Sequence, residues 1–371
     1  MDQITQQPKV SPINWRQVGT FLGLTFLITI LIDLLLWQWA GFGEGASTLL
    51  LLQLQMLIPA FTAILLGVFF FKDSPVYFRT YRERPRWFFY LFILFTLAYI
   101  ALAVLSVLMP EQAITISTVS GALNILVLML LVAIRALSGK DAFTKAGLRG
   151  GRSLDWLLWG AAFVLFYGLQ AALNALFGLG ERVDIPEVME SLGVQSGSMS
   201  PEVFLLVMTL QTVLIGAFLG IVMGFGEEYG WRGYLQGQLI KLGKKRGVLL
   251  VGLIWGVWHY PVIWMGHNYP GQPLWGTLLM TIYTVLLGFV LGHVILKTGS
   301  IWLVAFLHAL NNQVISFFTI MVYRASDPLL SFNTGVYGLL TMIPVVYLLL
   351  RDPVWKDDHI TPSTDITGEI A

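Results

Sequence analysis

The sequence contains no cysteine and few charged residues. The absence of cysteine among its 371 residues excludes disulfide bonds, thiolate metal ligands and a cysteine nucleophile. Only 12% of the residues are charged, against roughly 25% in a soluble domain, while 56% are hydrophobic. This balance predicts an all-α, polytopic integral membrane protein surrounded by lipid. The net charge of +1 argues against nucleic acid as a partner.

Apolar runs of membrane-spanning length recur along the whole chain. About 20 apolar residues in a helix cross a bilayer, and the sequence predicts about ten such helices. They are Val18–Trp39, Thr48–Phe71, Trp87–Met109, Val119–Leu137, Trp156–Phe177, Val203–Met223, Val248–Met265, Leu274–Leu296, Ile301–Val322 and Gly335–Leu350. The first run follows a long polar segment and lacks a small-residue cleavage site, so we expect a membrane span there and not a signal peptide.

Basic residues gather in alternate loops, and this pattern predicts the orientation. Lys and Arg cluster at residues 72–86, 140–152 and 241–246, and Lys297 lies in the next loop on that side. The intervening loops are acidic or nearly uncharged. Because cytoplasmic loops carry an excess of Lys and Arg, we expect both termini in the cytoplasm and the helices in the plasma membrane.

The chain divides into three parts by these criteria. Residues 1–154 hold the first four predicted spans, residues 155–350 hold a core that carries the polar residues of interest, and residues 351–371 form a polar cytoplasmic tail. Asp33 lies inside the first span with no second polar group one turn away. We therefore expect Asp33 to make a structural hydrogen bond to a neighbouring helix.

Ionisable residues in the C-terminal half of the chain fall at one depth. Glu227 follows the sixth apolar run, His259 lies in the seventh and His308 lies in the ninth. Counted from the neighbouring basic residues at 1.5 Å per residue, each lies about 15–20 Å in from the cytoplasmic side. Ionisable groups at bilayer depth are costly and mainly persist where they face the protein interior or water. The common depth predicts one site, built by catalytic helices of the C-terminal half.

Two adjacent carboxylates in this set have different surroundings. Glu228 and Arg232 are four residues apart, so they share one helix face, with the acid N-terminal in the favourable order. Glu227 points about 100° away around the same helix and has no partner in its own segment. We expect the Glu228–Arg232 pair to brace the structure and Glu227 to face the site.

The residue types in this set are suited to hydrolysis. A carboxylate and two imidazoles, here Glu227, His259 and His308, can hold a divalent metal such as zinc or orient a water without a metal, and both readings stay open. His308 and Asn312 lie four apart on one helix face and can donate hydrogen bonds to an oxyanion. Together these parts predict hydrolysis of an amide by an activated water inside the membrane.

Two other classes of protein stay open. One is a non-catalytic immunity or scaffold protein that keeps these residues for structure. The other is a proton-coupled transporter, although no repeat relates the two halves of the sequence. Other intramembrane proteases fit worse, because the sequence has no His-Glu-x-x-His motif, no Gly-x-Ser-Gly in a span and no second intramembrane Asp beside Asp33.

At these residues the chain resembles the CPBP family. The family comprises CAAX proteases and bacteriocin-processing enzymes, is also called Abi, and includes the Ras-converting prenyl endopeptidases. Its pattern is Glu-Glu-x-x-x-Arg, then Phe-x-x-x-His, then His-x-x-x-Asn. This sequence has EEYGWR from Glu227, WGVWH from Trp255 with Trp replacing Phe, and HALNN from His308. The resemblance extends from the fifth span to the ninth.

The resemblance implies an intramembrane metalloendopeptidase and a role for each residue. Glu227 would activate the water, His259 would bind the water or a metal, His308 and Asn312 would stabilise the oxyanion, and Glu228 and Arg232 would brace the site. The implied substrate is a membrane-associated peptide or lipidated protein, such as a CAAX-type C-terminus or a bacteriocin-like leader peptide. From the predicted topology we expect the scissile bond to be reached from the cytoplasmic side.

Overall fold

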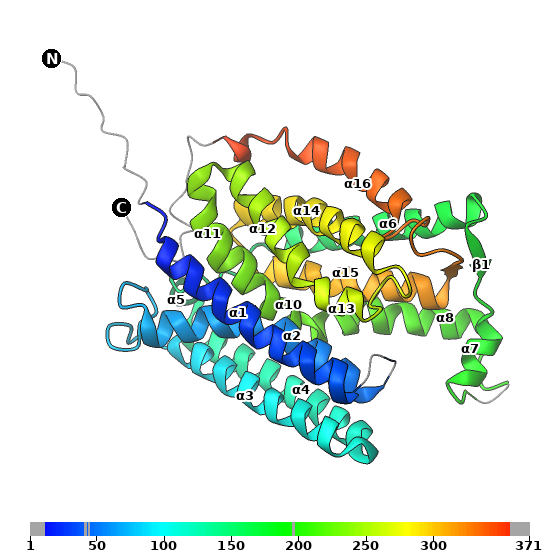
Figure 1. Ribbon diagram of the computed structural model, residues 1–371, viewed down its shortest axis with the longest axis horizontal. Coiled ribbons are helices and arrows are strands. Elements are labelled where there is room, and N and C mark those ends of the chain that lie inside the picture. Colours follow the sequence, from blue (N-terminus) through cyan, green and yellow to red (C-terminus); the bar gives the residue numbers. More distant parts are fainter. Residues whose placement is uncertain (1–11, 41–42, 44, 195–196, 357–371) are drawn as a thin grey trace.

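The protein is a bundle of long helices, seen in a computed structural model that describes residues 12–40, 43, 45–194 and 197–356 (Figure 1). The all-α, polytopic class predicted from composition is confirmed. The longest helices are α1 Trp15–Leu35, α2 Ala46–Leu65, α3 Arg86–Leu108, α4 Ala113–Ser138, α6 Ser153–Leu176, α14 Pro273–Thr298 and α15 Ile301–Met321. Short π-helical or 3-10 turns extend three of them, at η1 Leu36–Ala40, η2 Leu66–Phe70 and η3 Pro110–Gln112.

Eight helices of the described chain are long and apolar enough to cross a membrane. The predicted seventh and tenth spans are shorter than expected. α12, Lys244–Trp258, ends at His259 and is followed by the short helix α13, Tyr260–Trp264. Pro261 lies in the first turn of α13 and has no N–H to donate, so the helix cannot continue regularly through this point. α16, Val336–Leu349, has only 14 residues.

The segment that carries Glu227 is a helix buried on all sides. After α8 Pro201–Thr209, η4 Leu210–Gly216 and α9 Ala217–Leu219, the helical path continues beyond Gly220 as α10 Ile221–Glu228, η5 Tyr229–Leu235, α11 Gln236–Leu239 and η6 Ile240–Leu242. Every residue from 221 to 240 is buried. The helical path therefore continues past Met223, where the predicted sixth span ends, as far as Leu242.

Two glycines allow neighbouring helices to approach this segment closely. A Cβ atom on Gly224 would lie 2.2 Å from the Ala305 carbonyl oxygen of α15, and one on Gly226 would lie 2.4 Å from the Met56 carbonyl oxygen of α2. Both distances are far below van der Waals contact, so any side chain there would push the helices apart. The glycines therefore set the packing that brings α10 between α2 and α15.

The basic loops gather at one end of the bundle, here called the basic end (residues 72–86, 140–152, 241–246 and Lys297). Arg84 donates to the Leu137 carbonyl at 2.6 Å, and the Ser300 hydroxyl donates to the Arg149 carbonyl at 3.2 Å. The short helix α5, Lys140–Lys145, lies in the second of these loops. This end is on the left in Figure 1.

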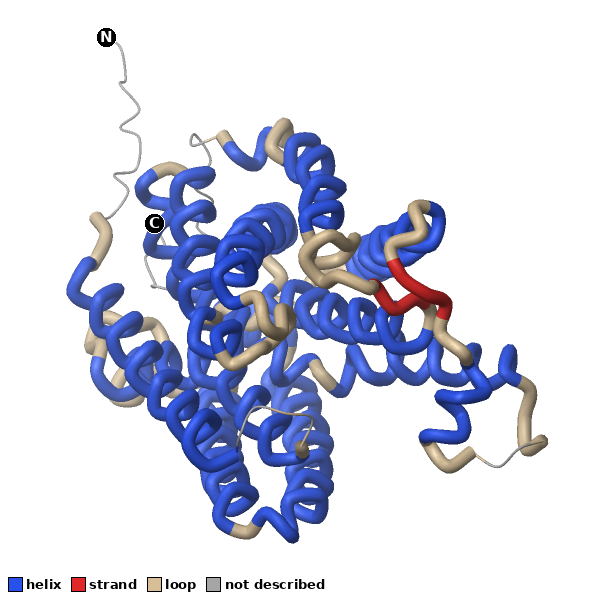
Figure 2. Tube along the Cα trace, turned by 45° about the vertical axis from the view of Figure 1, so that its right-hand side comes forward, coloured by secondary structure: helices blue, strands red, loops and turns tan. Residues whose placement is uncertain are grey.

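The loops at residues 177–194, 197–200, 266–272 and 323–335 form the opposite end. There β1 Gly180–Arg182 pairs antiparallel with β2 Tyr323–Ala325, and α7 Ile185–Ser191 follows β1. The Tyr269 hydroxyl donates to the Thr334 carbonyl at 2.8 Å, which joins the other two loops. The strand pair is on the right in Figure 2.

Two further expectations concern polar residues near the chain ends. Asp33 accepts a hydrogen bond of 2.5 Å from Gln55 of α2, so its predicted structural role is confirmed. Of the predicted polar tail, residues 351–356 are ordered against the bundle. They include η7, Pro353–Trp355, whose Trp355 is buried, and Lys244 donates to the Val354 carbonyl at 2.9 Å. Residues 357–371 lie outside the described part.

Candidate active site

Glu227 is held by side chains from two other helices. One carboxylate oxygen, Oε2, accepts a hydrogen bond of 2.7 Å from the Trp255 indole N–H of α12. The other, Oε1, lies 3.5 Å from Nε2 of His308 on α15. The three side chains are each 3% exposed, and all three line one cavity. Glu227 thus has a fixed orientation at a cavity wall, although it has no partner in its own segment.

Glu228 joins two parts of the predicted site. Its Oε1 accepts a 2.9 Å hydrogen bond from Arg232 Nη1 and lies 2.6 Å from Nδ1 of His308. The expected pairing with Arg232 is present, with both side chains fully buried. The contact with His308 was not expected from the helix-face argument, because it depends on how α15 packs against α10. Glu228 therefore orients His308 as well as binding Arg232.

Trp255 is a site residue to which the sequence analysis assigns no role. Besides donating to Glu227, its ring lies 4.2 Å below the Arg232 guanidinium carbon, and its centroid is 5.6 Å from the ring of His308. An attraction between cation and aromatic face fits this geometry. A phenylalanine could stack there but could not donate to the carboxylate. The indole N–H one turn before His259 was the available signal.

The cavity beside Glu227 has a volume of about 420 Å³. His259 and Asn312 both line it, so the structure brings all three predicted motifs to one space. His259 is half-buried, and its Nδ1 lies 2.8 Å from the Trp255 carbonyl oxygen. Asn312 is exposed to the cavity one helical turn after His308. Its side-chain oxygen accepts from the Asn311 amide at 3.2 Å, which leaves its own amide hydrogens available to a ligand.

Asn311, next to Asn312, is a second residue that the sequence reasoning missed. It is 2% exposed, and its side-chain oxygen accepts hydrogen bonds from the hydroxyls of Tyr167 at 2.5 Å and Tyr283 at 3.0 Å. These tyrosines come from α6 and α14, so Asn311 ties three helices together at the cavity wall, which Asn311 and Tyr283 line. Because its amide then donates to Asn312, the same network orients the predicted oxyanion donor.

The predicted metal ligands do not form a ligand set as they stand. Among the residues that the structure describes, no three His, Asp or Glu side chains lie close enough together to hold an ion. Both ring nitrogens of His308 face carboxylates, Nδ1 toward Glu228 and Nε2 toward Glu227. A metal needs an unprotonated ring nitrogen that points at it. The choice between a metal and a bound water at Glu227, His259 and His308 therefore stays a prediction.

One of the first four predicted spans, the second, contributes to this site. α2 packs closely on α10, and its residues Leu49, Leu52, Gln53, Gln55 and Met56 line the cavity. Among them, Gln55 also binds Asp33 of α1. The N-terminal part, residues 1–154, thus supplies one wall of the cavity, while the division of the chain at residue 154 stays a prediction.

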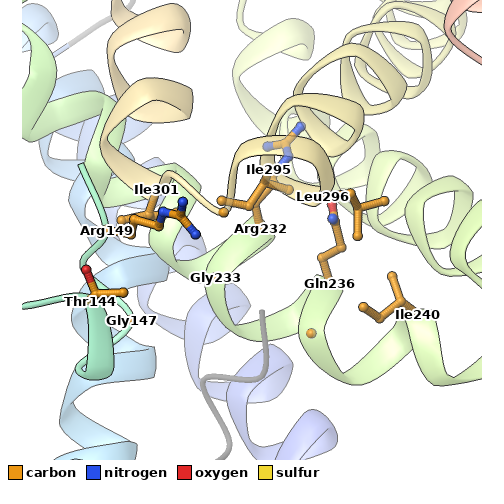
Figure 3. A pocket seen from close by; sticks show the side chains of 12 residues that line it. Thr144, Gly147, Arg149, Arg232, Gly233, Gln236, Ile240, Ile295, Leu296 and Ile301 are labelled. Carbon is orange, nitrogen blue, oxygen red and sulfur yellow. The ribbon is translucent and has the colours of Figure 1, made fainter. Parts of the chain in front are cut away.

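A second, smaller cavity lies on the basic side of Arg232. Its volume is about 30 Å³, and Figure 3 shows Arg149, Arg232 and Gln236 among the side chains around it. Arg232 Nε and Nη2 and the Gln236 side-chain oxygen have no hydrogen-bond partner within the described chain. A cavity of this size holds about one or two waters, which can satisfy these groups.

Comparison with known proteins identifies the same region. Residues 209–314 match the family model described as type II CAAX prenyl endopeptidase Rce1-like. Over 101 residues the chain is 30% identical to "CAAX prenyl protease 2" of Methanococcus maripaludis, a stretch that is 26% of this chain and 37% of that relative. No solved structure matches the chain. All six predicted site residues, Glu227 to Asn312, fall within the matched range.

Proposed function

We propose that this chain is an intramembrane endopeptidase that uses a water activated by Glu227, and the match of residues 209–314 to the Rce1-like family model supports this. The single observation that carries this proposal is the position of Glu227. Its buried carboxylate is fixed between Trp255 and His308 at the wall of a cavity of about 420 Å³. A carboxylate in such surroundings is suited to take and return a proton.

In the proposed reaction, a water between Glu227 and the substrate attacks the carbonyl carbon of a peptide bond. Glu227 accepts one proton from this water as the new C–O bond forms. It then gives the proton to the amide nitrogen, the C–N bond breaks, and a carboxylic acid and an amine leave. His259, on the same cavity wall, would hold the attacking water, and no metal takes part in the scheme.

The oxyanion formed in this reaction needs hydrogen-bond donors. The amide of Asn312 faces the cavity and is oriented by Asn311. His308 lies one turn earlier on the same face of α15 and is fixed by Glu228. We assign the Asn312 amide as one donor and His308 Nε2 as the other, because Nδ1 is bound to Glu228 while Nε2 lies 3.5 Å from Glu227. Fixed donors of this kind stabilise a transition state more than a mobile water would.

The lining of the cavity favours an uncharged polypeptide segment as substrate. It combines apolar side chains such as Leu52 and Met280 with amides such as Gln53 and Asn312. Among the described residues that line it, none is Lys or Arg. An acidic group would find no lysine or arginine in this lining, whereas the amides can bind a peptide backbone. A lipid-modified CAAX-type peptide and a leader peptide both offer such a segment.

The test is cleavage of a peptide mixture by the purified protein in detergent, with products identified by mass spectrometry. We expect Glu227→Gln to lower cleavage by about 100-fold or more, the range for loss of a general base. His259→Ala and His308→Ala should also abolish it while the variants remain folded. Glu202→Gln, which changes an exposed carboxylate at the start of α8, is the matched control and should cleave like wild type.

Cleavage at the wild-type rate by Glu227→Gln would remove Glu227 from the mechanism. The wild type could also show no cleavage that is lost in Glu227→Gln, while the cellular role survives in that variant. A non-catalytic scaffold would then be the better description. The transporter alternative has no supporting observation in the described structure.

A further inference from the structure

We propose that the substrate enters the site from the opposite end of the bundle, which is the non-cytoplasmic side of the membrane. That the cavity receives a substrate rests on the proposed function, but the geometry from which the side of entry is inferred is independent of catalysis. It would make the substrate a segment of an exported or membrane-spanning polypeptide, presented outside the cytoplasm.

The cavity extends from Glu227 to the loops of the opposite end. Its lining includes His267 and Asn268, which follow α13, and Thr334, which precedes α16. On α15, Ser316 lines it two turns beyond His308 and is exposed. Since α15 runs from Ser300 at the basic end to β2 at the opposite end, these residues mark a continuous wall from the site outward.

Toward the basic end the site is closed. Glu228 and Trp231 are completely buried, and every residue from there to Ile240 is buried as well. On α15, Leu303 and Val304 between His308 and the basic end are also completely buried. The cavity next to Arg232 is about 30 Å³, enough for a water or two but not for a peptide.

The charge distribution assigns the two ends to the two sides of the membrane. The basic end collects the Lys and Arg clusters at residues 72–86, 140–152 and 241–246. In the loops at 177–200 and 323–335 the bases are Arg182 and Arg324, among acids that include Asp184, Glu187 and Asp327. Because short loops rich in Lys and Arg remain in the cytoplasm, the basic end is cytoplasmic and the cavity faces away from it.

This proposal differs from the expectation of entry from the cytoplasmic side. That expectation counted residues inward from the basic loops, which gives the depth of the site. Depth does not say at which end the helices leave open space. The packing of α10 between α2 and α15 closes one end, and the break of α12 at His259, followed by the loop 266–272, leaves room at the other.

Thiol labelling in cells tests the side of entry, since the chain has no cysteine of its own. Ser316→Cys places one thiol in the cavity wall. Thr144→Cys is the matched control at the basic end, where Thr144 is exposed beside the small cavity. Ser198→Cys, in the exposed loop 197–200, reports on the opposite end. The probe is a membrane-impermeant maleimide, applied to intact cells and to inverted membrane vesicles.

We expect Ser316→Cys and Ser198→Cys to be labelled in intact cells and Thr144→Cys only in inverted vesicles. Labelling of Ser316→Cys only in inverted vesicles, as expected for Thr144→Cys, would overturn the proposal. So would a Ser316→Cys that is labelled in neither preparation but reacts once the protein is denatured. Reaction of Ser198→Cys only in inverted vesicles would overturn it as well. None of these outcomes depends on cleavage, so the side of entry and the proposed protease activity fail separately.

Discussion

Replacing Glu228 with Gln removes the carboxylate that binds both Arg232 and His308. The Glu228–Arg232 pair is fully buried, with 2.9 Å between Oε1 and Nη1, and Arg232 Nε and Nη2 already lack partners within the described chain. Removing one member of a buried pair leaves the other charge uncompensated and typically costs about 3–5 kcal/mol. We therefore expect the folded-to-unfolded ratio to fall by about a hundredfold or more.

The assay is thermal unfolding in detergent, with Asp155→Asn as the matched control. Asp155 also pairs with a nearby arginine, Arg152 at the N-cap of its helix, at 2.7 Å, but the arginine side chain is 77% exposed. Solvent screens that pair, so its loss should leave the melting temperature nearly unchanged. Glu228→Gln should melt several degrees lower. The double change Glu228→Gln with Arg232→Met should recover much of the loss, because it removes the unpaired charge.

Equal melting temperatures for Glu228→Gln and Asp155→Asn would refute the reasoning. A loss that Arg232→Met does not recover would show that the contact with His308, and not the ion pair, carries the effect.

Four further predictions address other parts of the structure. Trp255→Phe removes the N–H bound to Glu227 and should lower kcat about tenfold or more with little change in KM. The control Trp258→Phe, which removes an N–H bound to Thr29, should leave kcat unchanged. Equal kcat values for the two variants would contradict the role of Trp255. Gly224→Ala should lower both activity and melting temperature, since its Cβ would lie 2.2 Å from the Ala305 oxygen. The control Gly19→Ala in α1 should be tolerated, because a Cβ there meets no atom within 4 Å. A stable, active Gly224→Ala would count against close packing at this point. Elemental mass spectrometry should find far less than one divalent metal per chain, and near-stoichiometric zinc that is lost in His259→Ala and His308→Ala would establish the metal reading instead. Partial burial opposes ionisation of Asp352, but Lys297, the Val354 N–H and His293 outweigh it and hold the pKa of Asp352 below the usual range. The contribution of Asp352 to stability is therefore present above about pH 4 and is lost as the pH falls toward the folded pKa. On acidification the melting temperature should fall less steeply in Asp352→Asn than in wild type, and equal slopes would refute this.

The sequence by itself determined the class of the protein and predicted six residues of the site. Composition and apolar runs specify helices in a membrane, because unpaired backbone groups cannot be left in lipid. The placement of Glu227, His259 and His308 at a common depth follows from helical rise alone. The pairing of Glu228 with Arg232 follows from a spacing of four residues. Each of these inferences depends on local geometry or on the cost of a charge in an apolar medium.

Tertiary structure decided what the site residues contact and where the site opens. The contacts of His308 with Glu227 and Glu228, and that of Trp255 with Glu227, join helices that are distant in sequence. No helical spacing predicts such contacts, because they depend on how closely Gly224 and Gly226 let α10 approach its neighbours. The break at His259 and the cavity toward the opposite end likewise result from packing between helices, since empty space belongs to no single segment of the chain.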